Sequence, residues 1–150
     1  MSRLQADDSG NAIIEFVFVA VVVLVPLVYL IAAVATVQRT QLAVSDAARN
    51  AGRAFATSSN PASAPVRAQA AVRLALADQG LPDDATVRFV AAGAGCAAPP
   101  VIPVLAPGAV FTVCVSRHVV LPGVPTVLSG RGITSVGEYV VHVDDFRAAP

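Results

Sequence analysis

The chain has 150 residues, of which 55% are hydrophobic and only 13% are charged, and its mean hydropathy is +0.69. Ten basic residues, all of them arginine, balance ten acidic residues. This composition is typical of a membrane protein with room for one span and one small domain, and the absence of a basic patch excludes a nucleic-acid-binding surface.

The dominant feature is an apolar run near the N-terminus. From Phe16 to Val37 no residue is charged, and only Tyr29 and Thr36 carry polar groups. As a helix this run is roughly 33 Å long, close to the hydrocarbon thickness of a bilayer. A single strand would be far too long, and an amphipathic helix would show polar residues every third or fourth position. The run therefore predicts a transmembrane helix with the lipid bilayer around it.

The polar residues 1–10 in front of this run permit three interpretations. A secretory signal peptide would be cut after Ala35, since Ala33-Val34-Ala35 has the small-x-small pattern, although the apolar run is long and the leader acidic for such a signal. An uncleaved leader would make the chain a single-span anchor for an extracytoplasmic binding domain. The third interpretation comes from the residues that follow the leader.

Residues 10–16 read Gly-Asn-Ala-Ile-Ile-Glu-Phe, so that Gly10 ends the polar leader and Glu15 is the fifth residue of the apolar helix. This pattern resembles the class III signal of type IV pilins. The resemblance implies that a prepilin peptidase cuts after Gly10 on the cytoplasmic face. Asn11 would then carry the new amino group, one helical turn before Glu15.

An ionised carboxylate at the membrane edge is costly on insertion scales, so it normally has a partner. Cleavage after Gly10 would create an ammonium group at the same depth as Glu15. Between staggered helices, Glu15 of one subunit is expected to pair with the Asn11 amine of a neighbour, which would select the correct register. The simpler alternative is that Glu15 lies solvated among lipid headgroups.

The arginines that follow the span bear on its orientation in the membrane. Arg39, Arg49 and Arg53 follow the span, and by the positive-inside rule they favour a cytoplasmic C-terminal side, whereas the pilin resemblance implies the reverse.

Pro26 lies in the middle of the span and removes one helical hydrogen bond. A kink or local loosening is expected there, which membranes tolerate.

Beyond the span, the helix is predicted to continue in water to about Phe55. Its Ala-rich side is expected to pack against its own domain, and packing between subunits is the alternative. That side comprises Val37, Val44, Ala47, Ala48, Ala51 and Phe55. After a linker over 57–65, a second helix is predicted, capped by Ser63 and ended by Gly80. Its core-facing stripe is expected to be Val66, Ala70, Leu74 and Ala77.

The remaining sequence predicts strands over 85–91, 110–121 and 133–145, joined by long proline-rich connections. The expected fold class is α+β: a long N-terminal transmembrane helix continues into a small domain with a second helix and a three- to four-stranded antiparallel sheet. The domain organisation is a leader over 1–10, a helix over 11–56 with its span at 16–37, and an extracytoplasmic domain over 57–150.

Cys96 and Cys114 are predicted to form a disulfide in an oxidising compartment, closing a loop worth about 3 kcal/mol, with two reduced thiols as the alternative. His118 and His142 are expected to be solvated neighbours across the sheet. Two cysteines with two distant histidines make a poor metal site. The sequence contains no nucleophile elbow, phosphate loop or zinc-protease helix, so no metal, cofactor or catalytic residue is predicted.

The stretch from Ala47 to Ala56, Ala-Ala-Arg-Asn-Ala-Gly-Arg-Ala-Phe-Ala, resembles the Arg-bearing, Ala-rich stretch that follows the span in TadE-like proteins. Together with Gly10 and Glu15, it makes the chain resemble a TadE-like minor pilin of the tight-adherence Flp (type IVb) pilus.

This resemblance implies a role for each part of the N-terminus. Gly10 and Asn11 would be recognised by the prepilin peptidase, and Glu15 and Phe16 would govern assembly with other pilins and minor pilins. Inner-membrane pilus assembly proteins are further implied partners. The protein would reside in the cytoplasmic membrane with its domain outside, and would reach the cell surface in an adhesive pilus.

Overall fold

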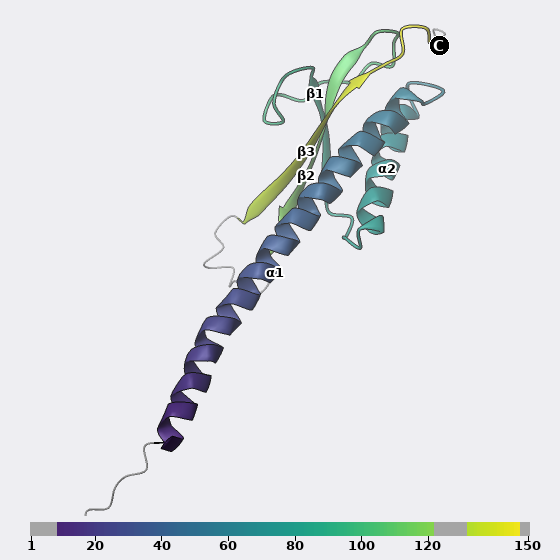
Figure 1. Ribbon diagram of the computed structural model, residues 1–150. Coiled ribbons are helices and arrows are strands. Elements are labelled where there is room, and N and C mark those ends of the chain that lie inside the picture. Colours follow the sequence, from purple (N-terminus) through teal and green to yellow (C-terminus); the bar gives the residue numbers. More distant parts are fainter. Residues whose placement is uncertain (1–8, 122–131, 148–150) are drawn as a thin grey trace, which may run out of the picture.

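The computed structural model describes residues 9–121 and 132–147, and within them it contains two helices and one three-stranded sheet (Figure 1). The helices are α1 (Ser9–Ala56) and α2 (Ala64–Asp78), and the strands are β1 (Thr86–Ala91), β2 (Val110–Val119) and β3 (Ile133–His142). The strand order is β1-β2-β3 with both pairs antiparallel. The predicted α+β class is confirmed; residues 1–8 of the predicted leader and the connection over 122–131 lie outside the described residues.

Helix α1 is continuous over 48 residues, roughly 72 Å at 1.5 Å per residue. Its C-terminal half runs beside the sheet and α2, whereas its N-terminal half projects beyond the domain (Figure 1). The Ala-rich side predicted to be apolar is buried in the domain core, as expected for packing within the chain. Its fully or almost fully buried members are Val44, Ala47, Ala48, Ala51 and Phe55.

Helix α2 packs on α1 through a different face from the predicted one. The predicted stripe was wrong, because Val66 and Leu74 are 64% and 65% exposed. An Ala-rich helix carries apolar residues on several faces, so spacing alone does not select the buried one. The face that packs is mostly alanine, which lets the two helix backbones approach closely. It consists of Ala64, Ala68, Val72, Ala75 and Leu76.

The two ends of α2 differ in how well the sequence predicted them. Ser63 occupies the N-cap position, but its side chain makes no capping hydrogen bond and donates to the Asn60 carbonyl instead. At the other end, Gly80 has φ +63°, its N–H donates to the Ala77 carbonyl, and the Leu81 N–H donates to the Leu76 carbonyl. This is the predicted Schellman stop.

The apolar face of the sheet packs on α1. Alternate residues of β2, including Phe111, Val113 and Val115, are buried in the core shared with the helices. Phe111 also stacks edge-on against Phe55 of α1, with ring centroids 4.9 Å apart, and Phe89 of β1 completes a cluster of three aromatic rings. The domain core is therefore built from helix and sheet together.

Glycine makes the close contact between α1 and β3 possible. A Cβ atom on Gly137 would lie 2.2 Å from the Val44 carbonyl oxygen, and a Cβ on Gly52 would lie 2.6 Å from the Tyr139 ring. Beside this contact the Gln41 side-chain amide donates to the Val136 carbonyl at 2.9 Å. The edge strand β3 thus packs directly against the backbone of α1.

Two arginines hold the C-terminal ends of the helices. The Arg39 guanidinium donates to the Gln79 carbonyl at the end of α2. Arg147, beyond β3, donates to the Ala56 carbonyl at 2.6 Å and to the Ser58 carbonyl. Cations at helix C-termini satisfy free carbonyls and complement the helix dipole, so these contacts fix α2 and the chain after β3 to α1.

The contact at Gly137 predicts that Gly137→Ala lowers the free energy of unfolding by about 1–3 kcal/mol, because the added methyl group meets backbone atoms of α1 that cannot rotate away. Gly95→Ala is the matched control, since a Cβ there meets nothing within 4 Å. Urea unfolding of the detergent-solubilised chain, followed by circular dichroism, measures both. Equal stability of the two variants would contradict the close contact.

Candidate functional site

The N-terminal half of α1 is the part of the chain that its own domain leaves uncovered. Every residue from Ala12 to Ile31 is exposed, over roughly 30 Å of helix. Within residues 9–121 and 132–147, α1 is the one helix long and apolar enough to cross a membrane, and none of its most apolar stretch is buried. A core helix of a soluble protein would be covered, so this segment is a candidate membrane anchor.

The residues predicted to govern processing and assembly lie together at the start of this segment. Gly10, Asn11, Glu15 and Phe16 occupy the first turns of α1, and Glu15 is four residues, about one helical turn, after Asn11. Glu15 is exposed and is the one charged residue between Ser9 and Gln38. A cut after Gly10 would leave Asn11 as the first helical residue, with the carboxylate near the positive end of the helix dipole.

Two residues of the candidate span, Pro26 and Thr36, are accommodated within the helix. The Thr36 hydroxyl donates to the Ala32 carbonyl at 2.8 Å, so it needs no partner outside the helix. Helix α1 continues without interruption through Pro26, which lacks only the N–H that would bond to the Val22 carbonyl. Neither residue prevents the segment from spanning a bilayer as one helix.

A disulfide joins Cys96 to Cys114, with Cα atoms 5.7 Å apart and a sequence separation of 18. Cys114 is on the central strand β2, and Cys96 is in the connection between β1 and β2. Arg88 donates to the Ala98 carbonyl at 3.1 Å, and the Val101 N–H donates to the Phe89 carbonyl at 2.8 Å. Together these contacts hold the connection against the sheet.

The two histidines do not meet. His118 pairs with Thr134, and His142 pairs with Val110, so they lie at opposite ends of the β2–β3 ladder. The expectation that they are neighbours was wrong, because antiparallel pairing brings the end of one strand to the start of the next. Among the residues that the structure describes, no three His, Cys, Asp or Glu side chains are grouped to hold a metal ion.

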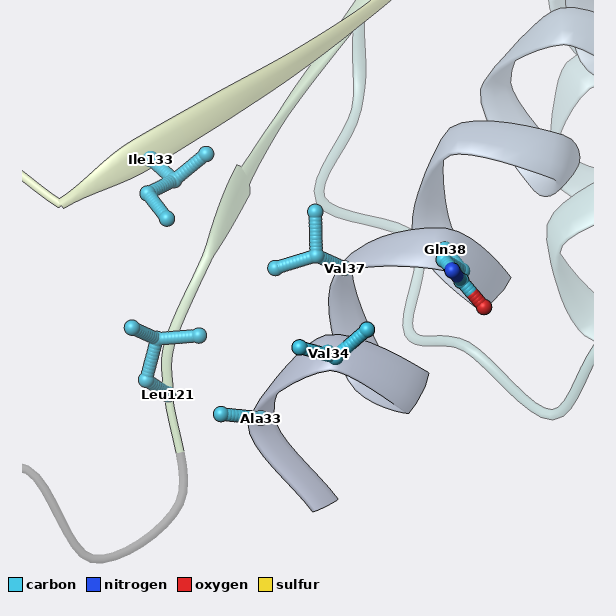
Figure 2. Close-up of a pocket in the computed structure, with 6 residues that line it drawn as sticks. All are labelled: Ala33, Val34, Val37, Gln38, Leu121 and Ile133. Carbon is cyan, nitrogen blue, oxygen red and sulfur yellow. The ribbon is translucent and has the colours of Figure 1, made fainter. Parts of the chain in front are cut away.

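An apolar notch with a volume of about 250 Å³ lies beside α1, and no pattern in the sequence predicted it. Figure 2 shows that side chains of α1 on one side and of the sheet ends on the other face one another across it. The sheet residues were missed because they approach α1 only after the whole domain has folded. The lining consists of Ala33, Val34, Val37, Gln38, Leu121 and Ile133.

The disulfide predicts a measurable stabilisation. Replacing both Cys96 and Cys114 with serine should lower the free energy of unfolding by about 3 kcal/mol, because the unfolded chain regains the freedom of an eighteen-residue loop. Reductant should destabilise the wild type by the same amount and leave the double variant unchanged. Unfolding curves that reductant does not move in the wild type would contradict the bond.

A function must account for three features: the uncovered helix with Glu15 near its start, the disulfide-bonded connection between β1 and β2, and the apolar notch. Comparisons of the chain with protein family models, with curated proteins and with solved structures found no match.

Proposed function

We propose that this protein is a TadE-like minor pilin, processed by a prepilin peptidase after Gly10 and taking part in assembly of a Flp-type pilus used for adhesion. The observation that carries the proposal is the uncovered apolar half of α1, with a carboxylate near its start and no break before the folded domain. Lipid would cover this half before assembly, and the helices of neighbouring subunits would cover it in the filament.

Glu15 favours a filament subunit over a plain anchor. An anchor needs apolar length alone, and a carboxylate at the edge of the span only makes insertion less favourable. A subunit that packs its helix beside others gains from Glu15, because pairing with the terminal amine of a neighbour is satisfied at one axial stagger only. Breaking a buried ion pair by removing one partner costs about 3–5 kcal/mol, which is enough to reject a wrong register.

The continuity of α1 supports the same proposal. One side of α1 is buried in the domain from Thr40 to Phe55, and the helix runs without a break from the uncovered half into this part. The axial offset between neighbouring helices that pairing at Glu15 would select therefore also sets the position of the domain. A tethered binding domain would gain nothing from such a rigid connection.

The disulfide supports an extracytoplasmic domain. Disulfides such as Cys96–Cys114 form and persist in oxidising compartments and are rare in the cytosol. Arg39, one of the arginines that would favour a cytoplasmic C-terminal side, bonds to the Gln79 carbonyl and so has a structural role. We therefore infer that the domain lies outside the cytoplasmic membrane, the orientation that pilin assembly requires.

A single-span anchored binding domain outside any filament is the second candidate, because the uncovered helix would serve it equally well. It assigns no role to Glu15 beyond solvation among headgroups. The two candidates therefore differ in what they predict when the Glu15 charge is removed while its shape is kept.

Glu15→Gln should leave membrane insertion unchanged and reduce incorporation into pili by tenfold or more, if about 1.4 kcal/mol or more of pairing energy is lost. Quantitative immunoblots of membrane and sheared-pilus fractions measure both steps. Glu138→Gln is the matched control, since it makes the same change at an exposed position of the domain. Normal incorporation of Glu15→Gln would favour the anchored domain.

A further inference from the structure

The apolar notch lies where the candidate span meets the domain. Its α1 wall is formed by Ala33, Val34 and Val37, the last turn of the uncharged run. Its other wall is formed by Leu121, two residues after β2, and by Ile133, the first residue of β3 (Figure 2). Among the described residues that line the notch, Gln38 is the polar one.

The depth of this notch relative to a bilayer is fixed by the helix. If Phe16 to Val37 fills the hydrocarbon layer, Ala33 to Val37 occupies its outermost part, roughly 6 Å along the axis. Thr40, less than one turn further on, is already fully buried in the domain. The domain therefore cannot lift away from the membrane, and the end of the sheet lies at the same depth as the end of the span.

The side chains around the notch are apolar and open to the surroundings. Ile133 is 44% exposed, Val34 is 47% exposed, and Val120, beside Leu121, is 72% exposed. Leaving such apolar surface in water is unfavourable, whereas the edge of the hydrocarbon layer would cover it. The nearest charged residue that follows on α1, Arg39, directs its guanidinium to the end of α2.

We propose that this end of the domain is seated in the outer edge of the bilayer, and that the notch between α1 and the sheet takes a lipid acyl chain. The inference rests on the membrane span and is independent of the pilus. An acyl chain matches a space whose described lining is uncharged and has a single polar side chain, and it is the molecule present at this depth.

The chain contains no tryptophan, so one introduced tryptophan is an unambiguous reporter. Ile133→Trp and Val120→Trp place it at the notch, and Ile102→Trp is the matched control at a residue 91% exposed in the connection between β1 and β2. Leu24→Trp reports on the span itself. Each full-length variant is reconstituted at low density in phosphatidylcholine vesicles whose acyl chains carry bromine at a shallow or a deep position.

Both notch variants should show blue-shifted emission and lose most of it with shallow bromine, whereas Ile102→Trp should keep its emission. Red-shifted, unquenched emission at both notch positions would overturn the proposal by placing them in water. Blue-shifted but unquenched emission would overturn it too, by showing that protein, such as a second copy of the chain, covers the notch. Quenching of Leu24→Trp by deep bromine distinguishes these failures from failure of the span.

Discussion

The structure depends on how closely α1 approaches the elements packed against it. Alanines on α1 and α2 bring the two helices together, and Gly137 allows the backbone of β3 to touch the backbone of α1 at Val44. This contact leaves no space for another side chain, so the domain is fixed to one half of the helix. The other half has no partner within the described chain, and its environment must come from elsewhere.

The uncovered half of α1 carries a different binding feature at each of its two ends. Glu15 supplies a charge at the start, and the notch around Val34 and Ile133 supplies an apolar surface at the end, roughly 28 Å further along the helix. A rigid helix between them keeps their separation constant. In the proposed account, lipid satisfies the apolar end of the isolated subunit, while the charged end is satisfied by a neighbouring subunit.

Local patterns were sufficient to predict most of the fold. The uncharged run identified the candidate span, because length and apolar composition are what a bilayer requires of a helix. Alternation of apolar residues placed the three strands within a few residues of their ends, because it reflects burial of one face of the sheet. The packed face of α2 was not predictable, since Val66 and Leu74 are larger than the alanines that pack in their place. The notch and the role of Gly137 arise from contacts between residues distant in sequence, which periodicity does not encode.

The central claim is that the uncovered helix begins at Asn11 in the mature protein, with its amine one turn from Glu15. The most direct measurement is the intact mass of the protein recovered from cell envelopes, confirmed by N-terminal sequencing. The account predicts a chain lacking its first ten residues and beginning at Asn11, and loss of the prepilin peptidase should restore them. A chain that still begins at Met1 in cells with an active peptidase would contradict it.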